Sequence, residues 1–307
     1  MNNSTIYIIG TGAIGKALAV FLKLADKQVI LIRGSVDNQP SSVEKFQVEL
    51  GDKTVLEASI EVSTLSQYKK LNGIIVLTNK SFGNENLSQA LKGKTDKSPI
   101  VLLQNGLGVE QSFIDNNFPE IYRCVLFATS QTTSQNTLRF KPVSISQVGT
   151  IQGTGNDLNN IIGQLNTPNF PFKAVDDIQT VIWKKAIANS VFNSVCPLLE
   201  IDNGIFHRNE TALAIARRVV TECVEIATAM GIALRVDEVV DSLVMISKAS
   251  DGQLISTLQD IKSKRETEIE TLNFSIVNMA KKLNKEAAVA ETKLLGELTR
   301  LKSQLNR

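Results

Sequence analysis

The stretch that decides the fold is "IYIIGTGAIG", residues 6–15, which places glycines at positions 10, 12 and 15 directly after a short apolar run. A lone Gly-x-Gly-x-x-Gly pattern is weak, because glycines also gather in ordinary turns. Here it follows a strand of the buried type and opens the helical stretch "GAIGKALAVFLKLA", the context that a dinucleotide fingerprint requires. The glycines permit a tight turn, a close approach of the backbone to a pyrophosphate, and close helix–strand packing. The residues expected to bind a dinucleotide are Gly10, Gly12, Ala13, Ile14 and Gly15.

The end of the second apolar run, "QVILIR" at 28–33, indicates which nicotinamide cofactor is bound. An NAD site places Asp or Glu near this point to accept a hydrogen bond from the ribose 2′-hydroxyl. Here the position is held by Arg33, and Gly34 and Ser35 follow it. A guanidinium pairs with a 2′-phosphate and cannot accept a hydrogen bond from a hydroxyl. We therefore predict NADP, with Arg33 as a cofactor-binding residue; an exposed cation at a strand end is the alternative.

Up to about residue 176 the chain alternates short β-branched runs with helical stretches. The runs "TIYIIG", "QVILIR", "GIIVLT" and "PIVLLQNG" are nearly continuous in apolar residues, as expected for parallel strands covered on both faces. The stretch "NENLSQALKG" is typical of a crossover helix, and "FQVELGDKTVLEAS" of a hairpin that turns at Gly51 and Asp52. This pattern predicts a Rossmann-type α/β domain over residues 1–176 that binds NADP.

After Asp176 and Asp177, which can cap a helix, the pattern becomes almost wholly helical. Helix periodicity covers residues 178–200, 209–230, 236–249, 253–284 and 286–305. We therefore expect an all-α domain over residues 177–307 that carries the substrate and catalytic residues. The last stretch, "ETKLLGELTRLKSQLNR", is amphipathic. A solvated surface helix is its default interpretation, and a homodimer contact is the alternative.

Composition excludes several classes of function. The 33 basic and 31 acidic residues leave a net charge of +2, which gives no electrostatic reason to expect nucleic acid or an anionic membrane as a partner. No apolar run approaches the length of a membrane helix, and "IYII" ends at Gly10 without a basic segment before it, unlike a signal peptide. The scattered cysteines (Cys124, Cys196 and Cys223) are expected to be reduced core thiols of a cytoplasmic protein. With His207 as the only histidine, we expect no metal site and no Ser-His or Cys-His catalysis.

Polar residues recur every four positions in "WKKAIANSVFNS", residues 183–194, whose other positions are mostly apolar. At about 100° per residue, Lys185, Asn189 and Asn193 lie one above the next on a single helical face. A surface lysine is the usual outcome for an arbitrary helix. The two asparagines, however, each cost helix propensity of a few tenths of a kcal/mol, so they need a partner or a ligand to account for them.

Taken together, these motifs resemble the ketopantoate reductase (2-dehydropantoate 2-reductase) family. The resemblance runs over nearly the whole chain, through "GTGAIG", "LTNK" ending at Lys80, "LLQNGLG", "WKKAIANSVFN", "DNG" and "STLQDIKSKRETEIE" in this order. It implies a Rossmann domain followed by a helical domain similar to the C-terminal part of 6-phosphogluconate dehydrogenase. It also implies NADPH-dependent reduction of 2-dehydropantoate to pantoate, a step of pantothenate biosynthesis.

The resemblance also implies roles for individual residues. Lys185 and Glu268 match the catalytic residues, and Lys80 and Asn105 lie on the side of the cofactor and the reaction centre. The residues matched to substrate binding are Asn105, Asn189, Asn193, Asn203 and Ser256. Reduction of a 2-oxo acid needs a hydride donor, a proton for the developing alkoxide and donors for the carboxylate. Lys185 can supply the proton, Glu268 can orient it, and the amides and Ser256 can both donate and accept hydrogen bonds.

Two of these residues also have a purely structural interpretation, and some of the motifs differ from those of the family. Ser256 can be a helix N-cap, and Glu268 lies in a charged stretch where a solvated face is the default. "KPVSISQVG" replaces a His-x-Gly-x-Gly type stretch, Ser194 replaces a usual proline, and Phe274 stands where glycine is common. "AAVAET" also lacks a usual proline. Two other functions remain as alternatives to the reduction of 2-dehydropantoate. One is a reductase of a different 2-oxo acid, and the other is a catalytically inactive NADP-binding regulatory protein.

Overall fold

The computed structural model describes residues 4–307, and these divide into two compact units. The first contains residues up to Gln104 together with Val109–Ile178. The second contains Gln179–Arg307 and the short segment Asn105–Gly108. The loop that carries the "NGLG" motif therefore groups with the helical unit, although both of its ends are continuous with the first unit.

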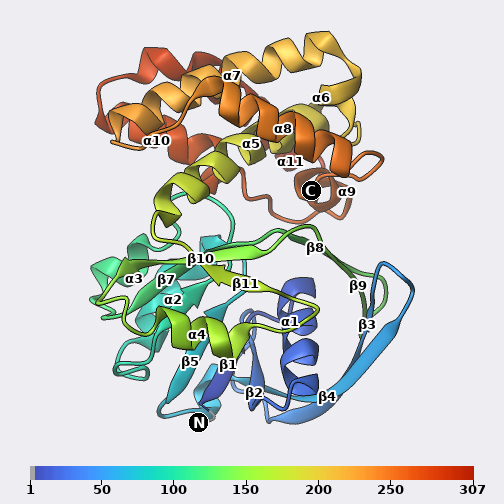
Figure 1. The fold of residues 1–307 in the computed structure, drawn as a ribbon, viewed down its shortest axis with the longest axis vertical. Helices are drawn as coiled ribbons and strands as arrows, with labels where there is room; N and C mark the ends of the chain where they lie inside the picture. The colour runs from blue at the N-terminus through green and yellow to red at the C-terminus, as the bar shows by residue number, and fades with distance from the viewer. Residues whose placement is uncertain (1–3) are drawn as a thin grey trace. The chain divides into compact units, whose positions relative to one another are not determined.

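The first unit is built on one sheet, whose described strands follow the order β11-β10-β7-β6-β5-β1-β2-β4-β3-β9-β8 (Figure 1). The central strands, all parallel, are β4 (Val55–Thr64), β2 (Val29–Arg33), β1 (Thr5–Ile9), β5 (Gly73–Leu77), β6 (Ile100–Leu102) and β7 (Ile121–Val125). If these six are numbered in the order of the chain, their order in the sheet is the 3-2-1-4-5-6 order of dinucleotide-binding domains. This confirms the expected Rossmann-type architecture. The order reverses between β1 and β5.

The outer strands are β3 (Ser42–Glu49), β8 (Ala128–Thr132), β9 (Thr137–Pro142), β10 (Ser146–Gln152) and β11 (Phe172–Ala174). β3 and β4 form the predicted hairpin, with Glu49 opposite Val55 at its turn. The helices of this unit are α1 (Ala13–Leu24), α2 (Asn84–Leu91), α3 (Gln111–Asp115) and α4 (Leu158–Leu165), with short 3-10 turns at Leu65–Gln67 and Ser81–Gly83.

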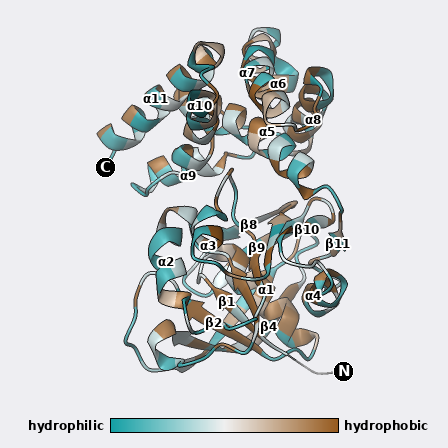
Figure 2. Ribbon diagram, turned by 90° about the vertical axis from the view of Figure 1, so that its left-hand side faces the viewer, coloured by the Kyte–Doolittle hydropathy of each residue, from teal (hydrophilic) through white to brown (hydrophobic). Residues whose placement is uncertain are grey.

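Apolar side chains cover both faces of the sheet, as its continuous apolar runs predict. On one face, α1 packs against β2, β3, β4, β8 and β9, and this end of the sheet curls around it (Figure 1). On the other face, a second cluster gathers Ile9, Leu77 and Leu102 with residues near α2 and α3. The strands are mostly brown in the hydropathy view, whereas α2 turns a teal surface outward (Figure 2).

The second unit is all-helical, as expected. Its helices are α5 (Ile178–Leu199, which begins at the last residue of the first unit), α6 (Ile205–Arg208), α7 (Glu210–Ala229), α8 (Val236–Ala249), α9 (Ser256–Lys262), α10 (Asn273–Lys282) and α11 (Ala290–Leu305), with 3-10 turns at Ile269–Thr271 and Glu286–Val289. α5 is buried on nearly all sides from Ile182 to Pro197 and so forms the centre of this unit.

One predicted element is wrong. Residues 253–284 form two helices and a 3-10 turn instead of one helix. α9 ends at Lys262, and Lys264 takes a positive φ of 56°, which terminates helical geometry. The charged residues that follow are mostly exposed up to Glu266. The seven residues from Lys262 to Glu268 are all polar, so the apolar periodicity of a helix is interrupted at this break.

Within residues 4–307, no helix is both long enough and apolar enough to cross a membrane.

Candidate functional site

The fingerprint loop lies at the point where the strand order of the first unit reverses. Gly10 follows β1 with a φ of 123°, a conformation that side chains other than glycine rarely adopt. A Cβ atom added here would also come within 2.5 Å of the backbone nitrogen of Asn79, which follows β5. The Thr78 hydroxyl donates to the Gly10 carbonyl oxygen at 2.9 Å. Gly10 therefore brings the carboxyl ends of β1 and β5 together at the place where open α/β sheets bind ligands.

The N-terminus of α1 is open to a ligand. Its N-cap residue, Gly12, is exposed and makes no side-chain cap, and a Cβ atom built there meets nothing within 4 Å. Gly15, in contrast, is buried against the Gly10 carbonyl group. No side chain of the N-cap residue bonds to the amides that begin α1, and a helix N-terminus of this kind attracts phosphate.

Polar atoms without partners surround this loop. Among residues 4–307, the buried Nη1 of Arg33 and the buried Oδ1 of Asn79 have no hydrogen-bond partner. Asn79 is otherwise held in place, because its carbonyl oxygen accepts from Gln104 and its amide nitrogen donates to the Lys80 carbonyl oxygen. Lys80 is half-buried at the start of the adjacent 3-10 turn.

These features fit a dinucleotide. Gly12 and the N-terminus of α1 would hold the diphosphate, and Arg33 lies at the end of the strand that meets the adenosine ribose. The Nη1 atom of Arg33 can still donate a hydrogen bond to a ligand. Its Nη2 atom is already engaged: it donates to Glu44 Oε1 at 2.6 Å.

In the second unit, two residues that are 80 positions apart in the sequence meet directly. Lys185 Nζ donates a 3.0 Å hydrogen bond to Asn105 Oδ1. Both side chains are half-buried. The neighbouring Lys184 points to a different partner and forms a 2.7 Å ion pair with Glu238 on α8. Adjacent lysines on α5 thus have separate environments, as a rotation of about 100° between them requires.

The loop that carries Asn105 is fixed against the turn that begins at Glu268. Leu107 donates its backbone N–H to the Thr271 carbonyl oxygen at 2.9 Å, and Thr271 in turn donates to the Glu268 carbonyl oxygen at 3.1 Å. Gly106 is buried with a φ of 99°, and a Cβ atom there would lie 2.6 Å from the Thr271 oxygen. These contacts place Lys185, Asn105 and the backbone of Glu268 in one continuous region of the second unit.

The two asparagines that follow Lys185 on α5 differ in their surroundings. Asn193 is 3% exposed, and its Oδ1 accepts hydrogen bonds from the Ser256 hydroxyl at 3.2 Å and from the Thr257 hydroxyl at 2.8 Å. It also accepts from the Thr257 N–H at 3.3 Å, so it caps the start of α9 from a distance. Asn189 is half-buried and uses its backbone oxygen to accept from Asn193. In this structure Asn193 therefore positions the exposed Ser256.

Asn203 is held by its backbone and keeps an unused acceptor. Its N–H donates to the Gln253 carbonyl oxygen at 2.9 Å, and its carbonyl oxygen accepts from the Ser247 hydroxyl at 2.7 Å. The residue is 7% exposed, and its Oδ1 has no partner in the described part of the chain. Because an unsatisfied buried acceptor costs roughly 1–3 kcal/mol, this atom is suited to accept a hydrogen bond from a ligand hydroxyl.

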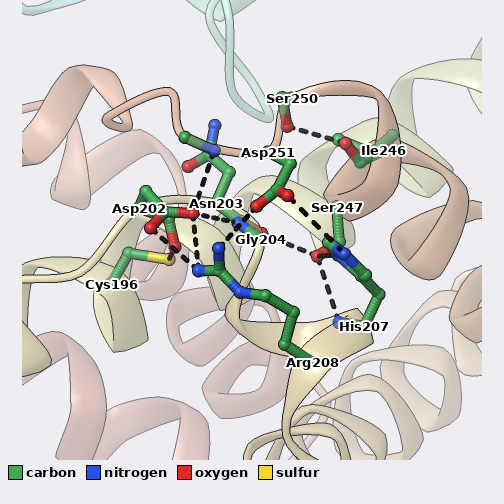
Figure 3. Close-up of polar contacts among 11 residues, drawn as sticks. Cys196, Asp202, Asn203, Gly204, His207, Arg208, Ile246, Ser247, Ser250 and Asp251 are labelled. Atoms are coloured by element: carbon green, nitrogen blue, oxygen red, sulfur yellow. Dashed lines mark hydrogen bonds and ion pairs between the residues drawn. The ribbon is translucent and has the colours of Figure 1, made fainter.

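A charged network fixes the turn that contains Asn203 (Figure 3). The Arg208 guanidinium lies between two carboxylates: it donates to both oxygens of Asp202 at 2.8 Å and to Asp251 at 2.7 Å. Asp202 also accepts from the backbone N–H groups of Gly204 and Gly252. Hydrogen bonds from Arg208 and from these amides lower the pKa of Asp202 to about 2. The network joins the turn after α5 to the segment that leads into α9.

Sequence reasoning did not find Glu44, Asp202, Arg208 or the steric role of Gly106. The sequence does show "DNG" at 202–204 and two glycines in "NGLG", but their partners come from distant segments.

Comparisons with known proteins identify the family and the fold. The family model "Ketopantoate reductase PanE/ApbA" matches residues 6–152, and "Ketopantoate reductase PanE/ApbA C terminal" matches residues 177–300. A 2-dehydropantoate 2-reductase from Pyrococcus abyssi is 26% identical over 283 residues, which are 92% of this chain and 93% of that protein. One from Archaeoglobus fulgidus is 23% identical and covers 96% of this chain and 97% of its own length.

Solved structures share the fold at lower identity. A D-mandelate dehydrogenase with NADH and anilino(oxo)acetate has a TM-score of 0.83 and 21% identity, with 98% of this chain and 99% of that chain covered. A PanE/ApbA family ketopantoate reductase from Ralstonia eutropha has a TM-score of 0.81 and 22% identity at the same coverage. A dimeric ketopantoate reductase from Staphylococcus aureus has a TM-score of 0.82 and 18% identity, covering 99% and 100%.

Proposed function

Because this chain belongs to the ketopantoate reductase family, whose members are oxidoreductases that act on 2-oxo acids, we propose that it reduces 2-dehydropantoate to pantoate with NADPH. The observation that carries the proposal is the hydrogen bond from Lys185 to Asn105. It unites two residues that the family resemblance assigns to the reaction centre from segments far apart in the chain. A regulatory protein that had lost its chemistry would have no need to keep this pair together.

The side chains of the second unit can do the work that the reaction requires. A nicotinamide cofactor whose diphosphate is held at the glycine loop would supply the hydride. Lys185 donates a proton to the alkoxide oxygen that develops on the substrate, while Asn105 holds the ammonium group in one direction. The backbone of Glu268 is tied to Thr271, and we propose that its carboxylate orients Lys185. Asn203 Oδ1 can accept from the substrate hydroxyl, and the exposed Ser256 can donate to its carboxylate.

The test is steady-state oxidation of NADPH with a panel of 2-oxo acids. The panel contains 2-dehydropantoate, an aromatic 2-oxo acid such as phenylglyoxylate, and an unbranched aliphatic one. We expect the highest kcat/KM with 2-dehydropantoate. A higher value with the aromatic acid would assign the chain to the chemistry of its D-mandelate dehydrogenase neighbour instead. No turnover with any acid, under conditions where NADPH binds, would favour a regulatory role.

A homodimer is part of the proposal. Exposed leucines recur along one face of α11 at spacings of four, three and four residues: Leu294, Leu298, Leu301 and Leu305. An exposed apolar stripe of this kind usually marks a contact with another chain. A relative of the same fold is dimeric. Sedimentation velocity should show a dimer that Leu298→Glu converts to a monomer; a monomeric unmodified protein would contradict this.

A further inference from the structure

The ion pair between Arg33 and Glu44 lies at the predicted position of the 2′ substituent of the cofactor. Arg33 is the last residue of β2 and pairs with Thr64 of β4, whereas Glu44 belongs to β3 on the far side of β4. The Arg33 side chain therefore reaches across one strand to meet Glu44 at 2.6 Å. The Ser42 hydroxyl bridges the two groups, at 3.4 Å from the guanidinium and 3.3 Å from the carboxylate.

Glu44 also acts on a second cation. Burial lowers the pKa of Lys16, which follows the fingerprint on α1, and the negative charge of Glu44 opposes that shift. Lys16 Nζ donates to the Gln135 carbonyl oxygen at 2.9 Å and lies 4.9 Å from the centre of the Phe46 ring. Glu44 is thus the carboxylate that faces both Arg33 and Lys16 beside the first turns of α1.

We infer that Glu44 is a specificity-determining residue, because it competes with the 2′-phosphate of NADPH for Arg33 and so limits the preference for NADPH over NADH. The inference rests on the proposed use of a nicotinamide cofactor. The Arg33 and Glu44 side chains are only 21% and 30% exposed, so water screens their charges incompletely. A 2′-phosphate carries close to two negative charges and needs the same guanidinium that the carboxylate already engages. A 2′-hydroxyl is neutral and can donate to it.

The experiment uses Glu44→Gln and measures the affinities of NADPH and NADH by fluorescence, without substrate. Glutamine keeps an oxygen that can accept from Arg33, so the guanidinium stays positioned while the negative charge is removed. The matched control is Glu57→Gln, in the neighbouring strand of the same hairpin, where Glu57 pairs with Lys45 at 2.6 Å. We expect Glu44→Gln to tighten NADPH by about 5- to 20-fold and to leave NADH unchanged or weaker. Glu57→Gln should change neither.

The double variant Arg33→Gln/Glu44→Gln tests whether the effect runs through Arg33. If the groups compete, removing the Glu44 charge should improve NADPH binding much less when Arg33 is absent. An unchanged ratio of affinities in Glu44→Gln, weaker binding of NADPH, or an equal gain with Arg33 absent would each overturn the inference. So would failure of the unmodified protein to bind either cofactor. Cofactor binding without turnover of any 2-oxo acid would contradict only the proposed function.

Discussion

Lys185 and Asn105 share a 3.0 Å hydrogen bond although they are 80 positions apart, with the segment Val109–Ile178 of the first unit between the loop at 105–108 and the rest of α5. Lysine side chains are long and flexible, and one that donates to a half-buried amide loses much of its freedom. Asn105 is tied to the helical unit, because the backbone N–H of Leu107, two residues further on, donates to the Thr271 carbonyl oxygen. This amine is therefore directed by the fold, as expected for a proton donor and not for a solvated surface lysine.

Lys185→Ala should reduce kcat on the preferred 2-oxo acid by about 10²–10⁴-fold, the usual range for loss of a general acid. The affinity for NADPH, measured by fluorescence, should stay within about twofold, because the fingerprint belongs to the first unit. Lys184→Ala is the control: it removes a partly exposed ion pair with Glu238 and should leave turnover nearly unchanged. Similar behaviour of the two lysine variants would remove Lys185 from the reaction.

Gly106→Ala should lower both stability and turnover. The new methyl group would combine a φ of 99° with a distance of 2.6 Å to the Thr271 oxygen, which accepts the Leu107 N–H. We expect a loss of about 3 kcal/mol or more in the free energy of unfolding, measured with urea, because strain and a clash act together. Gly108→Ala is a matched control, since Gly108 has a φ of 69° but open space around it. Its cost should be nearer 1 kcal/mol, and equal costs would show that the contact with Thr271 is unimportant.

Much of the fold could be predicted because its signals are local. Buried parallel strands appear as continuous apolar runs, and "GTGAIG" combines a turn, an open helix start and a close contact within a few residues. The break between α9 and α10 was not predicted, because the polar run from Lys262 to Glu268 that marks it is also typical of a solvated helix face.

The candidate site was predictable only in part, for a physical reason. Helical spacing places Lys185, Asn189 and Asn193 on one face, but it cannot show that Asn193 is occupied by Ser256 and Thr257. Likewise, Arg33 is visible at a strand end, whereas Glu44 becomes its partner only through the register of β2, β4 and β3. Contacts between side chains that are distant in sequence can be read only from the tertiary structure. The family resemblance indicated residues of one site only where their motifs were matched.

Arg33→Gln should weaken NADPH by on the order of 10- to 100-fold and NADH by much less, because a charge-assisted contact to phosphate is lost. Binding of each cofactor by fluorescence titration decides the matter. The control is Arg139→Gln, which breaks a 3.3 Å surface ion pair with Glu49 on the same sheet. Equal losses for both cofactors would refute the role assigned to Arg33.

Asp202→Asn should destabilise the protein near neutral pH, and the difference from the unmodified protein should vanish in acid. The pKa of Asp202 is lowered from 3.8 to about 2 in the folded protein, first of all by its hydrogen bonds from Arg208. A depressed pKa means that the carboxylate contributes stability fully above about pH 4 and loses that contribution as the pH falls through about 2. Asparagine can still accept from the Gly204 and Gly252 amides but lacks the charge that Arg208 requires.

Thermal unfolding at several pH values between about 2 and 7 measures this difference for Asp202→Asn and for Asp237→Asn as control. Asp237 forms a 2.7 Å ion pair with Arg217, but its side chain is 80% exposed, so its loss should matter little at any pH. If the difference in unfolding temperature between Asp202→Asn and the unmodified protein stayed constant across this range, the variant would have lost a neutral hydrogen bond and not a charge interaction.

Because Asn203 follows Asp202 directly, the same variant should raise KM for the 2-oxo acid more than it lowers kcat. An unchanged KM would separate the charged network from the substrate residue that it holds.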